Sequence, residues 1–316
     1  MKSSLSLLAL SVSLFSLLFV AYIAYSAGYN SQSAVIISPI PESGSSESVL
    51  AAQYAPENLK ENRLAAIVSN SLSGAPGEFS VYIKNLKTDE VYQKDANESF
   101  ESASLYKLWV MASVFQKIQN SKLTHSQILS QDVPTLNKKF QIDSEFAELS
   151  EGVITQSVDE ALEKMITISD NYSAMLLSEN VRLSTVSAFL KDNSLLHSSV
   201  GTSGGPPTTT ASDIGLFLEK LYYGDFADRQ STNVMLALLK NQKLRNGIPR
   251  LLPKNQLVAN KTGELGAYKH DAGIIFCDSG DYIIVLLSKS ENPKKAQDTI
   301  AFVSRDVFAF FCTNRN

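Results

Sequence analysis

The chain is poor in the residues that build disulfide frameworks and metal centres, because its 316 residues include only 2 cysteines and 3 histidines. Two cysteines are too few for a disulfide framework, and the sequence leaves open whether Cys277 and Cys312 are paired or are buried thiols. None of the histidines has the spacing of a metal-binding motif. We therefore expect no metal centre.

The chain also lacks an excess of positive charge, with a formal net charge of -4 at pH 7. It therefore has no overall basic field that would gather phosphates. No glycine-rich dinucleotide fingerprint, phosphate-loop lysine motif or solenoid repeat is present. We expect no nucleic-acid partner and no cofactor. A hydrophobic content of 44% with 19% charged residues is typical of a globular protein.

One long apolar run is present, near the N-terminus. From Ser4 to Ala27 nearly every residue is apolar or small, and Lys2 is the only early cation. The run matches the roughly 20 residues of a membrane-spanning helix, although Ala24-Tyr25-Ser26 has the small residues of a cleavage site. We therefore expect residues 1–27 to be a signal anchor or a signal peptide.

A flexible tether and one catalytic domain are expected after that run. Residues 28–55 are rich in Ser, Pro and Gly and have no sustained apolar period, which is typical of a linker. The domain over residues 56–316 would then lie outside the cytoplasm, anchored to the membrane by the N-terminal helix or secreted.

The order of strand and helix patterns indicates one fold class. Alternating apolar residues, typical of strands, occur at 79–83, 91–92, 257–259, 272–276 and 282–287. Helical spacing occurs at 105–118, through much of 121–241, and at 296–311. We predict an α/β fold of the α+β type: an antiparallel sheet of about five strands, flanked by N- and C-terminal helices, with an inserted all-helical subdomain over about 121–241.

The residues Ser104-Leu105-Tyr106-Lys107 form a Ser-x-x-Lys motif at the start of a predicted helix. A serine hydroxyl is a poor nucleophile until a base removes its proton, and a lysine one helical turn later places its amine on the same face. The free N–H groups at a helix start could also stabilise an oxyanion. Taken alone, the motif is explained more simply by an N-cap serine followed by a surface lysine.

Two further motifs carry groups suited to the same chemistry. Ser169-Asp170-Asn171 lies between two helical stretches; it could be a capping turn, or the Ser169 hydroxyl could relay protons while the Asn171 amide binds substrate. Lys261-Thr262-Gly263 follows a predicted strand, where lysine could attract a substrate carboxylate and glycine would let substrate lie against the strand edge.

Together and in this order, the three motifs resemble the signature of the class A β-lactamases and penicillin-binding serine hydrolases. The resemblance covers about residues 57–316. It implies that Ser104 is acylated, that Lys107 and Ser169 transfer protons, and that substrate is bound by Asn171, Lys261, Thr262, Gly263 and the backbone of Glu264. Relatives usually carry a small residue in place of Glu264. Because the oxyanion hole needs only backbone N–H donors, those of Ser104 and Glu264, this change concerns substrate shape more than catalysis.

The main departure from the family concerns release of the acyl group. In the lactamases, a loop glutamate positions the water that cleaves the acyl-enzyme, but between Leu195 and Thr208 this chain has no carboxylate. His197 could be a substitute base or simply a solvated loop histidine. Lys269 and His270 could supply a second cation for a substrate carboxylate or form a solvated strand end.

The resemblance therefore implies a serine hydrolase that opens β-lactams through an acyl-Ser104 intermediate, with slow deacylation. A penicillin-binding D,D-carboxypeptidase or transpeptidase acting on D-Ala-D-Ala peptides is the first alternative. A β-lactam-binding or cell-wall-binding protein without turnover is the second. The expected partners are a small-molecule β-lactam or a peptidoglycan stem peptide, and the membrane through the N-terminal helix. We expect a monomer.

Overall fold

The computed structural model describes residues 55–202 and 205–313. The predicted leader (1–27) and all of the predicted tether (28–55) except Ala55 lie outside the described residues. Within the described ranges, no helix is both long enough and apolar enough to cross a membrane.

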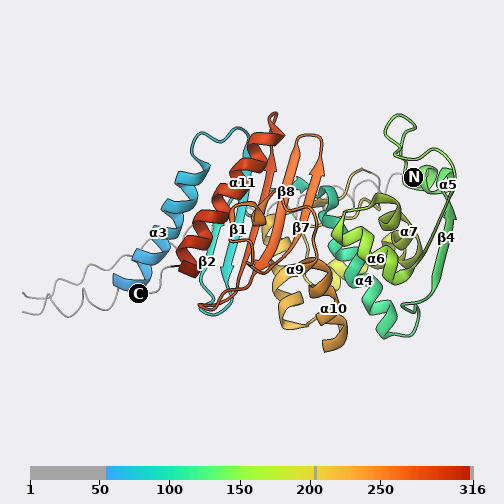
Figure 1. Ribbon diagram of the computed structural model, residues 1–316, viewed down its shortest axis with the longest axis horizontal. Coiled ribbons are helices and arrows are strands. Elements are labelled where there is room, and N and C mark those ends of the chain that lie inside the picture. The colour runs from blue at the N-terminus through green and yellow to red at the C-terminus, as the bar shows by residue number, and fades with distance from the viewer. Residues whose placement is uncertain (1–54, 203–204, 314–316) are drawn as a thin grey trace, which may run out of the picture. The chain divides into compact units, whose positions relative to one another are not determined.

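The centre of the domain is a five-stranded antiparallel sheet with the strand order β2-β1-β9-β8-β7 (Figure 1). Its strands are β1 (Glu78–Asn85), β2 (Val91–Lys94), β7 (Val258–Leu265), β8 (Tyr268–Ile275) and β9 (Tyr282–Lys289). Strands from both ends of the chain pair, with Val81 of β1 opposite Leu286 of β9. This arrangement confirms the predicted sheet. Strand β7 is longer than predicted, so that the Lys261-Thr262-Gly263 motif lies inside an edge strand.

Both faces of the sheet are covered, as the central strand β9 shows. Its side chains alternate between two cores: Ile283, Val285 and Leu287 pack on one side, and Ile284 and Leu286 on the other. The second core includes α3 (Ala55–Leu72) and α11 (Pro293–Phe308), which lie together along the sheet in Figure 1. A strand buried on both faces reads as a continuous apolar run.

Helices of the inserted subdomain and α9 (Ala211–Tyr223) form the first core. Helix α9 approaches the sheet closely because Gly215 has no side chain: a Cβ built there would lie 2.4 Å from ring carbons of Tyr82. The remaining helices are α4 (Lys107–Gln119), α5 (Val133–Lys139), α6 (Val158–Thr167), α7 (Asn171–Val181), α8 (Leu183–Asp192) and α10 (Arg229–Lys240), with the short helices η1 (Ala103–Tyr106) and η2 (Ile248–Leu251).

The inserted subdomain is not purely helical. Strand β4 (Ile128–Asp132) pairs with β5 (Val153–Ser157). A second short ladder joins β3 (Phe100–Glu101) to β6 (Thr208–Thr209). The apolar alternation that predicts strands is weak in β4 and β5, because each buries a single side chain and exposes much of the rest.

Helix α4 runs through the middle of the subdomain. Every residue from Lys107 to Phe115 is buried. A helix that is surrounded on all sides has no solvated face for a charged residue. Its first residue, Lys107, therefore extends into the protein interior.

Cys277 and Cys312 form a disulfide, which answers the question that the sequence left open. The bond ties the C-terminal η3 helix (Ala309–Thr313) to the segment that follows β8. A tilted ring contact between Phe311 and the buried Tyr282, with centroids 5.0 Å apart, supports the same attachment. The disulfide thus fixes the end of the described chain to the sheet.

Candidate active site

The Ser-x-x-Lys serine lies in the tight turn of η1, just ahead of α4. Ala103 has a φ of 43°, an unusual value for a residue with a side chain, and the Ser102 N–H donates to the Pro207 carbonyl at 2.8 Å. A Cβ built on Gly263 would lie 3.1 Å from the Ser102 carbonyl oxygen. The glycine of the third motif therefore lets β7 lie against the turn that carries Ser104.

Lys107 is fully buried, and its amine is held by the second motif. Its Nζ donates to the Ser169 carbonyl oxygen at 2.5 Å, the Asn171 Oδ1 at 2.8 Å and the Ser169 Oγ at 3.2 Å. Burial lowers the pKa of Lys107 to about 8, an effect opposed by the carboxylates of Asp170 and Glu148. A lysine of this pKa is partly neutral near pH 7 and can accept a proton.

Ser169 lies between two lysines. Its Oγ is 3.2 Å from the Lys107 Nζ and 2.9 Å from the Lys261 Nζ, so it accepts from both amines. Its backbone has a φ of 61°, a strained value for serine that recurs at functional sites. Asp170 stabilises this turn by capping α7, since its carboxylate accepts the Ser173 N–H at 2.6 Å. The hydroxyl is thus placed to carry a proton between groups.

The Asn171 side chain is oriented by contacts at both of its ends. Oδ1 accepts from Lys107, and Nδ2 donates to the Glu148 Oε1 at 2.6 Å. Because an ionised carboxylate can only accept, the amide nitrogen must face Glu148, which turns the amide oxygen toward Lys107.

Lys261 is also fully buried, in the middle of β7. Its Nζ donates to the Thr262 carbonyl oxygen at 2.8 Å as well as to Ser169. Burial and the neighbouring Lys107 lower its pKa well below the usual value. Asp271 lies opposite Thr262 on β8, and its buried carboxyl accepts from the Asn260 Nδ2 at 2.8 Å. Burial raises the pKa of Asp271 to about 7.

These elements meet at a cleft of about 910 Å³. It is lined by residues of all three motifs or next to them: Ser104, Ser169, Asn171, Thr262 and Glu264. Its apolar lining includes Phe140, Ile142, Phe146, Met175, Leu183, Val200, Leu244 and Leu265. Lys107 and Lys261 reach the cleft through Ser169, to which both donate. The structure therefore brings the three motifs to one site, with a serine hydroxyl, amines and space for a small molecule.

Three candidate residues are placed differently from the roles considered for them. His197 is 64% exposed, lies 3.6 Å from an oxygen of Asp213 and does not line the cleft, so its position does not suit the substitute base. His270 is buried, and its Nδ1 accepts the Ser288 N–H at 3.1 Å. Its pKa is lowered to about 4 by burial, so the imidazole is neutral and cannot be a second cation. Lys269 forms an ion pair with Glu264.

Glu148 is a charged cleft residue that the sequence motifs do not predict. It belongs to the long segment between α5 and β5 and reaches Asn171 only because that segment folds back on α7. It stands in no motif and in no periodic pattern. No sequence signal could have identified it.

The loop over 195–208 contributes no carboxylate to the cleft. Its cleft-lining residues are Val200, Gly201, Thr202, Gly205, Pro206 and Pro207. The acidic residues that do line the cleft, Glu101, Glu148 and Glu264, come from other segments. Within residues 55–202 and 205–313, no group of three or more His, Cys, Asp or Glu side chains could hold a metal ion.

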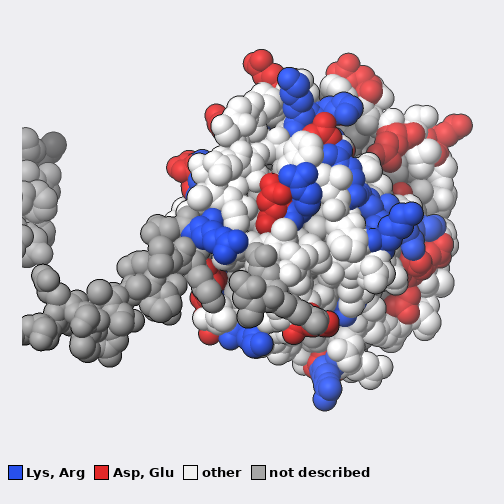
Figure 2. All heavy atoms as spheres, turned by 60° about the vertical axis from the view of Figure 1, so that its left-hand side comes forward, with Lys and Arg blue, Asp and Glu red and all other residues white. Residues whose placement is uncertain are grey.

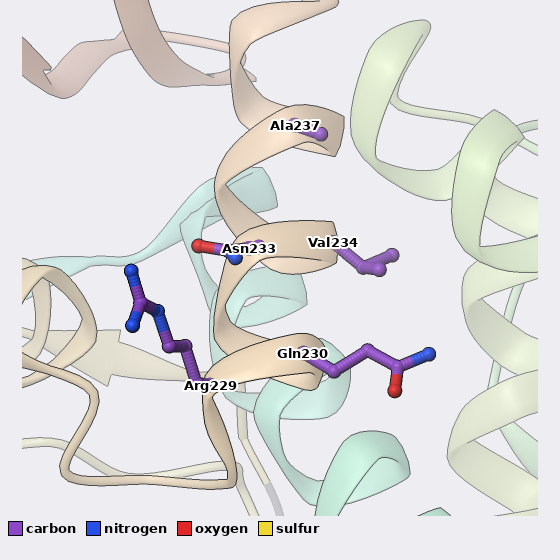
Figure 3. Close-up of a pocket in the computed structure, with 5 residues that line it drawn as sticks. All are labelled: Arg229, Gln230, Asn233, Val234 and Ala237. Atoms are coloured by element: carbon purple, nitrogen blue, oxygen red, sulfur yellow. The ribbon is translucent and has the colours of Figure 1, made fainter.

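The rest of the surface has features of a different kind. Figure 2 shows one face on which Lys and Arg are interspersed with Asp and Glu. Figure 3 shows a depression on α10, where all the lining residues belong to that one helix: Arg229, Gln230, Asn233, Val234 and Ala237. This depression contains none of the motif residues, so the 910 Å³ cleft is the candidate active site.

A sheet with an inserted helical subdomain, and a serine and two buried lysines at their junction, defines a serine hydrolase of the β-lactamase type. The chain belongs to the β-lactamase enzyme family, whose sequence profile matches residues 61–311. This confirms the resemblance found in the motifs. Among curated proteins, none matches the chain closely enough to count as a relative.

Solved structures share the fold at low sequence identity. A β-lactamase from Sphaerobacter thermophilus DSM 20745 superposes with a TM-score of 0.68 at 20% identity, covering 78% of this chain and 95% of its own. PBP-A superposes with a TM-score of 0.67 at 19% identity, covering 81% of this chain and 96% of its own. A point mutant of PBP-A, solved as an acyl-enzyme complex with penicillin G, gives 0.69 at 20% identity, with 81% and 97% covered.

Proposed function

We propose that the chain is a serine β-lactamase-like hydrolase that is acylated at Ser104 by β-lactams and releases the acyl group slowly. The observation that carries this proposal is the Lys107 amine: it is fully buried, is held by Ser169 and Asn171, and has a pKa lowered to about 8. It lies one helical turn after a serine that lines the cleft. A neutral amine in that place is a base for the serine hydroxyl.

Acylation begins when neutral Lys107 takes the Ser104 proton as Oγ attacks the lactam carbonyl carbon. The carbonyl oxygen becomes an oxyanion, stabilised by the backbone N–H groups of Ser104 and Glu264. The carbon–nitrogen bond then breaks, and the departing nitrogen takes a proton from Ser169, which recovers one from Lys107. The acyl group remains as an ester on Ser104.

Release of the acyl group needs a base that activates water. The 195–208 loop has no carboxylate, and His197 lies outside the cleft, beside Asp213. This absence supports slow deacylation, because an unactivated water attacks an ester slowly.

A D,D-carboxypeptidase or transpeptidase acting on D-Ala-D-Ala peptides is the second candidate. The fold shared with PBP-A favours it, and the acylation step would be the same. A binding protein without turnover is the third, but it would not need Lys107 and Ser169 placed for proton transfer. For each candidate, the disulfide and the apolar N-terminal run support a place outside the cytoplasm, anchored or secreted.

The proposal is tested by incubating the protein with a chromogenic cephalosporin and measuring its intact mass. We expect a mass increase of one opened drug, mapped to Ser104 and absent in Ser104→Ala. If the wild type gains no mass and releases no coloured product, the proposal is wrong. Parallel incubation with a D-Ala-D-Ala peptide decides between the candidates, because release of D-Ala at a rate above drug turnover would favour the peptidase.

A further inference from the structure

Glu148 brings a carboxylate into the cleft from outside the three motifs. Its Oε1 accepts the Asn171 Nδ2–H at 2.6 Å, and it lines the cleft together with Ser104. The acylation mechanism assigns it no role. Its contact with Asn171 nevertheless places it where that amide would meet a substrate.

The backbone next to Glu148 is fixed by two helices. The Leu149 N–H donates to the Tyr172 hydroxyl at 3.0 Å, and that hydroxyl lies 2.9 Å from the Leu149 carbonyl oxygen. The same carbonyl accepts from the Asn137 Nδ2 of α5 at 2.9 Å. Tyr172 is buried and directly follows Asn171 in α7. The Glu148 carboxylate and the Asn171 amide are therefore both positioned by contacts with α7.

The contact leaves Asn171 able to bind substrate. A side-chain amide nitrogen has two N–H donors, so one can reach Glu148 while the other points to a substrate carbonyl. Lys107 holds the amide oxygen from the other side. Glu148 thus orients the Asn171 amide, and the acyl side chain of a bound substrate would lie beside that amide.

No Lys, Arg or His among the described residues forms an ion pair with Glu148, although its carboxylate raises the pKa of the Lys107 amine. Lys139, which lines the same cleft, forms an ion pair with Glu179. Glu264, at another part of the cleft, is paired with Lys269. A carboxylate without such a partner repels anions and attracts cations in its neighbourhood.

We propose that Glu148 is a specificity-determining residue that favours substrates with an ammonium group on the acyl side chain, next to the carbonyl that Asn171 binds. This inference rests on the proposed function, because acylation at Ser104 is what brings that side chain to Glu148. The substrate class is therefore an amino-substituted β-lactam, or a peptide with a free amine at the corresponding position.

Three penicillins that differ at one carbon provide the test: benzylpenicillin, ampicillin with an ammonium group, and carbenicillin with a carboxylate. Acylation rate constants are measured by intact mass at a pH at which the ampicillin amine is protonated. In Glu148→Gln the ampicillin to benzylpenicillin ratio should fall about fivefold relative to wild type, and the carbenicillin to benzylpenicillin ratio should rise similarly. Comparing ratios between variants cancels the intrinsic reactivity of each drug.

Two further variants separate charge from folding and from position. Glu145→Gln removes a charge from the same segment, away from the cleft lining, and should keep the wild-type ratios. Glu148→Ala also removes the acceptor for Asn171 and should slow all three drugs in addition to changing the ratios. A loss of rate without a change of ratio in both Glu148 variants would show a purely structural role and overturn the inference.

The pH profile gives an independent readout. The charged groups that face the Lys107 amine are Glu148, Asp170 and Lys261. Because the Glu148 carboxylate favours the charged amine, its removal should move the midpoint of the acylation profile to lower pH, whereas Glu145→Gln should not.

The outcomes distinguish this inference from the proposed function. Unchanged drug ratios in Glu148→Gln, with Ser104 still acylated by all three drugs, would overturn the role of Glu148 alone. No acylation of the wild type by any of the drugs would overturn the proposed function and this inference with it.

Discussion

The two sides of the cleft differ in what they offer to the reaction. On one side, η1, α4 and β7 place Ser104 beside a network in which the amines of Lys107 and Lys261 are fully buried and both reach Ser169. On the other side, the 195–208 loop lines the cleft with small, apolar and proline residues and has no carboxylate.

Under the proposed function, this difference separates the two halves of the hydrolytic cycle. Forming the acyl-enzyme depends on groups whose pKa and position are set by burial in regular elements. Releasing it depends on a base that the loop does not supply. The proposed enzyme would therefore keep the first half of the cycle intact while the second is weakened.

The largest expected effect is loss of the base. Lys107→Ala should lower the acylation rate constant by about 10² to 10⁴-fold, the range for removal of a positioned general base. The measurement is the rate of mass gain with a chromogenic cephalosporin. Lys122→Ala, which removes an exposed lysine just beyond α4, is the control and should acylate at the wild-type rate. Near-normal acylation of the Lys107 variant would contradict the proposed role of this side of the cleft, because acylation would then not need the buried amine.

The pH dependence of acylation should follow Lys107. Its pKa in the folded protein is lowered to about 8, and the neutral form is the active base. The rate should therefore rise with pH, change about tenfold per unit well below the pKa, and level off above it. A rate independent of pH between 6 and 9 would exclude Lys107 as the titrating base.

The disulfide should matter for stability and not for acylation. Lys269, near the start of β8, pairs with Glu264 at the cleft. Cys277 follows the other end of β8, so the disulfide lies away from the cleft. Because it closes a loop with a sequence separation of 35 residues, Cys312→Ser should lower the free energy of unfolding by about 4 kcal/mol. Urea denaturation measures this loss, and a matching loss of acylation rate would show that the cleft depends on the C-terminal attachment.

The smallest expected effect is at His197. His197→Ala should change the deacylation rate by less than about twofold, because its exposed imidazole lies beside Asp213 and outside the cleft. The rate at which the acylated protein returns to its free mass is the measurement. A tenfold slower deacylation in this variant would show that His197 is the base for deacylation. The 195–208 loop would then supply a catalytic group, and the two sides of the cleft would no longer differ in this respect.

The sequence predicted the parts of the fold that have strong periodic patterns. Strands β1 and β9 and helices α4 and α11 lie close to the predicted ranges, because burial on one or both faces leaves a clear apolar pattern. The β4–β5 ladder was missed, since strands that bury one side chain each leave no such pattern. Pairing of Cys277 with Cys312 depends on distance in space, which the sequence does not contain.

The site was predictable where short motifs lie on regular elements. One residue of each motif lines the same cleft: Ser104, Ser169 and Thr262. Motifs that belong to one active site are expected to meet in this way. Side-chain direction was not predictable: His270 points into the interior between β3 and β9, where Glu101 and Ser288 bind its two nitrogens. Glu148 could not be found, because a long segment without a pattern brings it to Asn171.

The central claim, fast acylation followed by slow release, is tested most directly by the first turnovers with a chromogenic cephalosporin in excess. We expect a burst of colour equal to one molecule of product per protein molecule, followed by a much slower steady rate while the protein carries the opened drug on Ser104. Rapid linear turnover from the start, with free protein throughout, would contradict this claim and would mean that a cleft group outside the 195–208 loop activates the water.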